Sequence, residues 1–174
     1  TKGFDDLAIN GYLTVTPYYN KPTQQGMLAH FKAVASATDK PIILYNVPGR
    51  TCVDLANESV IELMAVPNIV GLKDATGDLT RLAPLRAASG DFALMSGDDM
   101  TGRAYVEAGG DGVISVTANV EPKLMSQMMQ AIKNQAHDLA HTIDDKLSGL
   151  HMDLFIEPNP VPAKWALKEK GQIR

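Results

Sequence analysis

Five short apolar runs alternate along the chain with segments whose apolar residues recur at helical spacing. Each run is rich in Val, Ile, Leu or Tyr and is bounded by Gly, Pro, Asn or Asp, which favours strands buried on both faces. The runs predict strands over 11–19, 40–49, 68–76, 91–99 and 111–119. The segments between them predict helices over 24–38, 57–66, 79–88 and 101–108. This strict alternation indicates parallel βα units.

Beyond residue 119 the strand pattern stops and only helical spacing follows. Helices are predicted over 122–137, 140–155 and 163–170, and the stiff segment EPNPVP leads into the last of them. At the other end of the chain, the opening TKGFDDLAIN is expected to be the end of a helix. Both chain ends lack terminal signals, so the sequence is expected to be a fragment of a longer protein.

Five parallel strands fit either an open doubly wound α/β sheet or part of a (β/α)8 TIM barrel, which needs eight strands and about 250 residues. No GxGxxG or P-loop follows any predicted strand, which disfavours the open nucleotide-binding sheets. The barrel interpretation makes 1–119 the equivalent of barrel strands 4–8, with three earlier strands absent, and 120–174 the last barrel helix and the start of a C-terminal helical region. Polar side chains gather at the C-terminal ends of the runs, where barrel enzymes place their chemistry: Thr16, Tyr18, Tyr19, Tyr45, Asn46, Lys73, Asp74, Ser96, Asp98 and Ser115.

Composition narrows the function classes. The chain has 174 residues, of which 45% are hydrophobic and 21% charged, as in a globular domain. The net charge of −4 and the absence of a basic run argue against a nucleic-acid partner. No apolar stretch approaches the roughly 18 residues of a membrane span. The single cysteine, Cys52, excludes an internal disulfide, fits a cytoplasmic protein and is expected to be a small buried side chain.

Lys73 stands at the end of an apolar run, NIVGLKDAT, where a solvated charge is not expected. Desolvation disfavours the ammonium form, lowers the pKa and leaves a neutral amine that can attack a ketone or aldehyde to form a Schiff base. The alternative is a solvated lysine or one paired with Asp74 or Asp78.

Aromatic and basic residues follow the neighbouring runs. Tyr45 could relay protons, or could be a core tyrosine with a satisfied hydroxyl. Arg50 carries a planar fork that suits a carboxylate substrate, although a loop arginine is often only solvated. Tyr18 and Tyr19 form an aromatic pair typical of an interface, or pack on the barrel rim.

Metal sites are disfavoured. Asp98 and Asp99 are adjacent without a third acidic ligand, so a helix cap is the favoured role for one of them. His137 and His141 have the i,i+4 spacing of a zinc pair but lack the glutamate of HExxH and are expected on a helix surface.

The motifs TPYYNKP, LYNVPGRT, GLKDATGD, SGDD, GVISVTAN and EPNPVPAKW, in this order, resemble the dihydrodipicolinate synthase family of pyruvate-dependent class I aldolases. The resemblance extends over essentially the whole chain. It implies a lyase that condenses pyruvate with L-aspartate 4-semialdehyde to 4-hydroxy-tetrahydrodipicolinate in lysine and diaminopimelate biosynthesis. It further implies a cytoplasmic homodimer or homotetramer that needs no metal or other cofactor, with lysine as a possible feedback inhibitor.

By the same resemblance, Lys73 matches the Schiff-base lysine and Tyr45 a tyrosine of the proton relay. Tyr19 matches the tyrosine that completes the relay of the neighbouring subunit, and Arg50 the arginine that holds the semialdehyde carboxylate. Gly97 and Ile114 match residues that line the pyruvate pocket, and Tyr18 matches a contact of the allosteric lysine site.

Two departures leave alternatives open. The family's Thr-Thr-Gly-Glu stretch, which supplies the relay threonine, is not in the chain, and Cys52 replaces a frequent glycine without an expected effect. The alternatives are a sibling aldolase such as N-acetylneuraminate lyase, or an inert truncated product that only self-associates.

Overall fold

The five predicted strands form one parallel sheet. The computed structural model describes residues 1–4 and 7–174, without the side chain of Lys2. The strands are β1 (Tyr12–Val15), β2 (Ile42–Asn46), β3 (Ile69–Asp74), β4 (Ala93–Ser96) and β5 (Gly112–Val113). They pair in the order β1-β2-β3-β4-β5. A doubly wound sheet reverses its strand order at a switch point, whereas a barrel adds each strand on the same side. The order therefore supports a partial (β/α)8 barrel.

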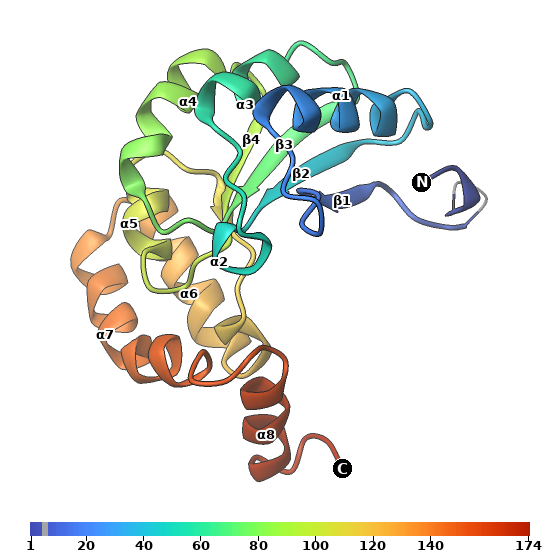
Figure 1. Cartoon of the computed structure of the whole chain (residues 1–174). Coiled ribbons are helices and arrows are strands. Elements are labelled where there is room, and N and C mark those ends of the chain that lie inside the picture. The colour runs from blue at the N-terminus through green and yellow to red at the C-terminus, as the bar shows by residue number, and fades with distance from the viewer. Residues whose placement is uncertain (5–6) are drawn as a thin grey trace.

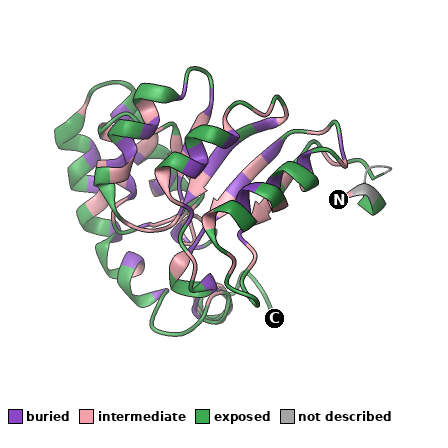
Figure 2. Ribbon diagram, turned by 45° about the horizontal axis from the view of Figure 1, so that its top comes forward, coloured by how far each residue is buried: buried purple, intermediate pink, exposed green. Residues whose placement is uncertain are grey.

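Helices cover one side of this sheet. In Figure 1, α1 (Gln24–Ala35), α3 (Asn57–Leu63), α4 (Leu82–Ala88) and α5 (Gly102–Glu107) lie along the outer side of the strands. Their apolar residues and those of the strands form the main core, which includes Phe31, Leu44, Leu63, Leu72 and Leu85. Figure 2 shows the buried positions concentrated along the strands and the sheet-facing sides of the helices.

The expectation that both faces of the strands are buried is wrong for this chain. In β2, Ile42, Leu44 and Asn46 are buried, whereas Ile43 and Tyr45 between them are only half-buried. The two sets point to opposite faces because side chains alternate along a strand. The half-buried set faces the concave side, which the five strands do not close.

Three corrections concern the helices of the N-terminal half. A short helix, α2 (Pro48–Thr51), was not predicted, and it places Arg50 on a helix rather than in a loop. The segment predicted as one helix over 79–88 is a 3-10 turn, η2 (Leu79–Arg81), followed by α4. Pro84 fits within the first turn of α4, where the missing N–H has no helical partner to lose. At the N-terminus a 3-10 turn, η1 (Lys2–Phe4), takes the place of the expected helix end, and Asp5 and Asp6 lie outside the described residues.

The C-terminal half of the chain is helical, with different boundaries from those predicted. A 3-10 turn, η3 (Thr117–Asn119), follows β5, and then come α6 (Pro122–Lys133), α7 (His137–Asp153) and α8 (Val161–Glu169). The single helix predicted over 122–137 ends early because Gln135 has a φ of 59°, which helical backbone does not allow. The last predicted helix starts two residues earlier than expected, with a proline in its first turn. None of the described helices is long and apolar enough to cross a membrane.

Candidate active site

Lys73 and Tyr45 are neighbours on the concave face of the sheet. Lys73 is the residue before the last of β3, and its parallel partner in β2 is Tyr45. Residues in register on adjacent strands project to the same side. The Lys73 Nζ consequently lies 4.3 Å from the centroid of the Tyr45 ring. This distance allows a cation–π contact when the amine is protonated.

Lys73 is half-buried, and burial lowers the pKa of its amine. The negative charge of Asp99 opposes this effect and the positive charge of Arg50 adds to it. Among the described residues, Lys73 makes no ion pair, whereas the adjacent Asp74 pairs with Arg81 on the opposite face. The alternative in which Lys73 pairs with Asp74 or Asp78 is therefore wrong.

Gly97 makes room for the stem of this lysine. A β-carbon at Gly97 would lie 2.8 Å from the Lys73 Cε and 2.9 Å from the Ala75 Cβ, which is closer than carbon atoms pack. The backbone N–H of Gly97 donates to the carbonyl of Asp74 at 2.7 Å and so extends the β3–β4 pairing past the end of β4. The glycine therefore lets two strand ends approach while the Lys73 stem runs between them.

The Lys73 amine faces a cavity of about 800 Å³. One wall consists of strand ends and α2, with Tyr45, Arg50 and Gly97. Val116 contributes from the turn after β5, and the opposite wall is the segment 155–159 after α7. Burial raises the pKa of the Tyr45 phenol, and the charge of Arg50 partly offsets this. The site thus combines an amine, a phenol and a guanidinium around a space that can hold a small acid.

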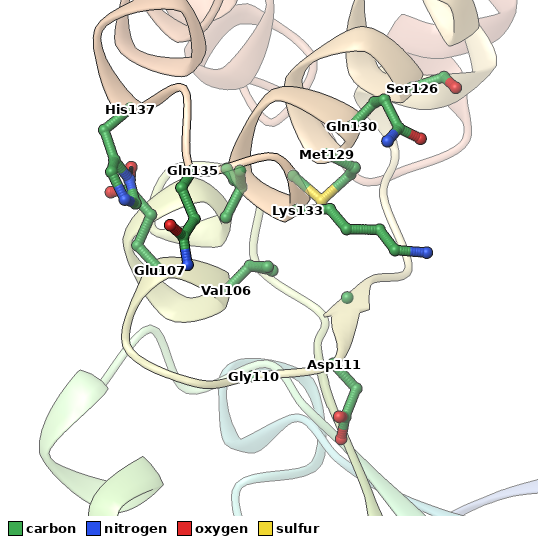
Figure 3. A pocket seen from close by; sticks show the side chains of 12 residues that line it. Val106, Glu107, Gly110, Asp111, Ser126, Met129, Gln130, Lys133, Gln135 and His137 are labelled. Atoms are coloured by element: carbon green, nitrogen blue, oxygen red, sulfur yellow. Dashed lines mark hydrogen bonds and ion pairs between the residues drawn. The ribbon is translucent and has the colours of Figure 1, made fainter.

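A second cavity, of about 700 Å³, lies between α5 and α6 (Figure 3). Its lining includes Gly110 and Asp111, which precede β5, so it is at the N-terminal ends of the strands. In parallel-strand enzymes the chemistry lies at the opposite, C-terminal ends. The cavity around Lys73 is therefore the candidate active site.

The short helix α2 fixes the position of Arg50. Pro48 stands in its first turn, which suits the fixed φ of proline, and Cys52 ends it with a left-handed φ of 55°. The expectation that Cys52 is buried is wrong, because this capping position turns its side chain to solvent. Arg50 is also exposed, at the mouth of the cavity.

A polar network on the outer face holds the ends of β2 and β3 in register. Asn46 donates to Asp54 at 2.7 Å and to Asp74 at 3.3 Å, and accepts from the backbone of Leu55 at 3.0 Å. Arg81 donates to Asp74 at 2.7 Å and to the Leu55 carbonyl at 2.7 Å. Asn46 and Asp74 were both predicted as site candidates from their strand-end positions. They hold the strand ends in place on the face opposite Lys73. Sequence reasoning missed Arg81 because no strand pattern contains it.

The acidic pair after β4 has two separate structural roles. Asp98 accepts hydrogen bonds from the backbone N–H and the hydroxyl of Thr101, at 2.9 and 2.7 Å, just before α5. The N-cap of α5 is Thr101, without a side-chain cap, so the expected helix cap is wrong and Asp98 instead closes the turn before the helix. Asp99 accepts from the backbone N–H groups of Val116 and Thr117 at 2.8 and 3.0 Å. Sequence reasoning missed this second role because the partners are 17 and 18 residues away.

Three predicted site residues lie apart from the Lys73 cavity. Tyr18 and Tyr19 are 62% and 95% exposed in the loop after β1, and neither lines the cavity. Packing of Tyr19 onto the rim is therefore wrong for this chain. Ile114, after β5, is exposed and does not line the cavity either, although Val116 of the same segment does.

The two histidines that had the spacing of a zinc pair contact carboxylates. His137 and His141 are both exposed on α7, as expected. The Nδ1 of His137 lies 3.0 Å from Glu107, and the Nε2 of His141 lies 3.7 Å from Asp145. In the part of the chain that the structure describes, no three His, Cys, Asp or Glu residues group as metal ligands do.

Comparison with known proteins extends over the whole chain. Residues 1–174 match the profile of the dihydrodipicolinate synthetase family. A 4-hydroxy-tetrahydrodipicolinate synthase of Laribacter hongkongensis is 54% identical over 168 residues, which cover 96% of this chain and 58% of that protein. The chain therefore spans little more than half the length of the curated relatives it matches.

Solved structures agree with the sequence comparison. The chloride-inhibited dihydrodipicolinate synthase of Acinetobacter baumannii, in complex with pyruvate, superposes with a TM-score of 0.95 at 50% identity and covers 100% of this chain and 60% of that one. The enzyme of Cyanidioschyzon merolae with lysine bound has a TM-score of 0.94 at 42% identity, over 98% of this chain and 59% of that one. With its strand order, its strand-end lysine and these matches, the chain belongs to the dihydrodipicolinate synthetase family.

Proposed function

We propose that this protein is a Schiff-base-forming lyase that condenses pyruvate with L-aspartate 4-semialdehyde to give 4-hydroxy-tetrahydrodipicolinate. The observation that carries the proposal is the half-buried Lys73 amine, whose pKa burial lowers, beside Tyr45 in a cavity at the C-terminal strand ends. Relatives with this activity in their names are more than half identical to the chain. The Acinetobacter baumannii relative was solved with pyruvate bound.

The first half of the reaction makes a carbon nucleophile. The neutral Lys73 amine adds to the ketone carbon of pyruvate, and the carbonyl oxygen leaves as water to give an imine. The protonated imine withdraws electrons, so the methyl group loses a proton and an enamine forms. The Tyr45 hydroxyl is suited to carry these protons because it lies in the same cavity and burial keeps its pKa high, in the protonated form.

The second half forms the carbon–carbon bond. The enamine carbon attacks the aldehyde carbon of the semialdehyde, and its oxygen takes up a proton to become the hydroxyl. The substrate amine then attacks the imine carbon, closes the ring and expels the Lys73 amine. Arg50, exposed at the mouth of the cavity, is positioned to pair with the carboxylate of the incoming semialdehyde.

The exposed tyrosines belong to the assembly in this proposal. Tyr19, 95% exposed, completes the proton relay of a neighbouring subunit in a homodimer or homotetramer. Tyr18 contacts lysine at an inhibitory site, which the lysine-bound Cyanidioschyzon merolae relative supports. The proposed location is the cytoplasm, where pyruvate is available.

A sibling aldolase that cleaves N-acetylneuraminate is the second candidate within this family of reactions. Arg50 favours the synthase because its guanidinium suits a short acidic aldehyde better than a polyhydroxylated sugar. Turnover of pyruvate with aspartate semialdehyde, measured against cleavage of sialic acid by the same preparation, distinguishes the two enzymes.

A specific observation favours a third candidate, an inert product that only self-associates. The edge strands β1 and β5 each have one unpaired side, and unpaired edges promote association between chains. Incubation with pyruvate and borohydride decides between this candidate and a Schiff-base enzyme, because hydride reduces the imine to a stable secondary amine. A mass gain located at Lys73, absent in Lys73→Ala, supports the proposal. A wild-type chain that is folded but gains no mass supports the inert candidate.

A further inference from the structure

A buried histidine connects the two walls of the Lys73 cavity. His151 is 2% exposed in α7, and its Nδ1 lies 2.8 Å from the Oγ1 of Thr117, which is itself fully buried at the start of η3. Polar groups lose water when they are buried, so a pair of this kind is stable only while the two groups satisfy each other. The hydrogen bond therefore fixes α7 against the turn that follows β5.

This turn is held from the sheet side as well. The carboxylate of Asp99 accepts the backbone N–H groups of Val116 and Thr117, and Asp99 is 2% exposed. Val116 in turn lines the Lys73 cavity. Asp99 thus holds the backbone of Val116 and Thr117, and His151 holds the side chain of Thr117.

The opposite wall of the cavity starts four residues after His151. This wall is the segment 155–159, which follows the end of α7. Between the two, Leu154 packs with Val120 and Ala163 in a small core of its own. The Nζ of Lys170 donates to the Val120 carbonyl at 2.9 Å and so joins the end of α8 to the same region. The 155–159 wall therefore follows directly from the end of α7. Through His151, α7 also contacts the turn that contains Val116.

Behind His151, a series of charges connects α7 to α5. The His151 Nε2 lies 3.4 Å from the Oδ1 of Asp144, without hydrogen-bond geometry. The other Asp144 oxygen accepts from Arg103 at 2.9 Å, and Arg103 pairs with Glu107. Figure 3 shows Glu107 and His137 pointing toward each other at the far end of this series. Among the described residues, the imidazole is therefore hydrogen-bonded through Nδ1 alone, and its Nε2 faces the Asp144 carboxylate without a hydrogen bond.

The Thr117, His151 and Asp144 side chains have the residue types of a hydrolase triad, but the setting excludes that chemistry. A nucleophilic hydroxyl must face a space that admits substrate. Thr117 is fully buried and lines neither the Lys73 cavity nor the cavity between α5 and α6. The hydroxyl is therefore available only to His151.

We propose that His151 is a positioning residue, which sets the separation between the Val116 wall and the 155–159 wall through its hydrogen bond to Thr117. It touches neither substrate nor Lys73, and acts on how closely the cavity holds the keto acid against the amine. The expected effect on pyruvate trapping rests on the proposed function. The expected effect on the separation of the two cavity walls does not.

The test uses paired variants of the full chain. Thr117→Val and His151→Leu remove the hydrogen bond at nearly constant volume, whereas Thr117→Ser and His151→Asn keep a group that can form it. The exposed His141→Gln on the same helix is the matched control. Borohydride trapping of pyruvate is measured against pyruvate concentration, and amide hydrogen exchange is measured over 116–117 and 155–159.

Thr117→Val and His151→Leu are expected to reduce the trapping rate at low pyruvate about tenfold, mainly through a higher half-saturating concentration, because small displacements in an active site have large kinetic effects. In both variants, amide hydrogen exchange is expected to become faster over 116–117 and over 155–159. Thr117→Ser, His151→Asn and His141→Gln are expected to stay within about twofold of the wild type.

A lower unfolding temperature of Thr117→Val with unchanged exchange at both walls assigns the pair a merely structural role and overturns the proposal. Equal trapping curves in folded wild type and Thr117→Val overturn it as well. When the folded wild type itself gains no mass, the proposed function fails, and hydrogen exchange alone then decides the positioning proposal. Should His151→Leu not fold, the isosteric Thr117→Val carries the same test.

Discussion

A β-carbon added to Gly97 would lie 2.8 Å from the Cε of Lys73, closer than two carbon atoms can pack. The absence of a side chain at one strand end is therefore a condition for the position of the amine on the neighbouring strand. At Gly97 the need for glycine is steric, because its backbone does not have a positive φ.

Gly97→Ala is expected to displace the Lys73 stem and to lower the rate of pyruvate trapping at Lys73 by at least about tenfold. The measurement is borohydride trapping with localisation of the mass gain. Gly149→Ala, on α7, is the control because a β-carbon there meets nothing within 4 Å. A Gly97→Ala chain that traps pyruvate at the wild-type rate contradicts the steric role of Gly97.

The charges around Lys73 predict opposite shifts of its pH dependence. Only the neutral amine attacks a ketone, so trapping rises as the pH passes the pKa of Lys73. Arg50 lowers this pKa and Asp99 raises it. Arg50→Gln is therefore expected to move the pH profile upward and Asp99→Asn to move it downward.

The trapping rate at saturating pyruvate, recorded from pH 6 to pH 10, tests both shifts, because saturation removes effects on pyruvate binding. Lys32→Gln is a suitable control, since Lys32 is exposed on α1 and pairs with Glu62 instead. Shifts of the same sign in Arg50→Gln and Asp99→Asn are incompatible with direct electrostatic control of the amine.

Much of the fold follows from the alternation of apolar runs and helical segments. Buried parallel strands are recognisable because their apolar runs are short and end in turn residues. The helix α2 was missed because a four-residue helix has no apolar period and depends on Pro48 and the left-handed Cys52 at its ends. The break at Gln135 was missed for a similar reason, because nothing in its residue type requires a positive φ.

The pairing of Lys73 with Tyr45 could be predicted from the sequence, whereas the contacts that hold the cavity walls could not. Lys73 and Tyr45 could be placed together because both stand at the ends of runs that adjacent parallel strands bring into register. The residues that hold the walls, Asp99 and His151, have partners 17 to 34 positions away. A single sequence contains no pattern for such a pairing, since it depends on how the helices pack on the sheet.

The left-handed φ of 55° at Cys52 predicts a stabilising substitution. Residues with a β-carbon are disfavoured in this region by roughly 1–2 kcal/mol relative to glycine. Cys52→Gly is therefore expected to raise the free energy of unfolding by about 1 kcal/mol, as measured in urea. Cys52→Ala keeps the β-carbon and is expected to change little, so an equal gain in both variants points to the thiol and not to the backbone.

The buried ion pair between Asp74 and Arg81 predicts a large loss of stability. The side chains of Asp74 and Arg81 are only 3% and 11% exposed, and the Arg81 Nε lies 2.7 Å from the Asp74 Oδ2. Arg81→Met removes the cation and leaves a buried carboxylate, whose remaining partners include the amide of Asn46. An unpaired buried charge costs about 3–5 kcal/mol, and urea unfolding measures it.

Asp74→Asn in the Arg81→Met background supplies the control for this last prediction. The amide at position 74 removes the buried negative charge, so the double variant is expected to recover part of the stability that Arg81→Met loses. The ends of β2 and β3 are held by the same network, so Arg81→Met is also expected to loosen the Tyr45–Lys73 pair. A double variant as unstable as Arg81→Met alone excludes the uncompensated carboxylate as the cause and points to the hydrogen bond from Arg81 to the Leu55 carbonyl.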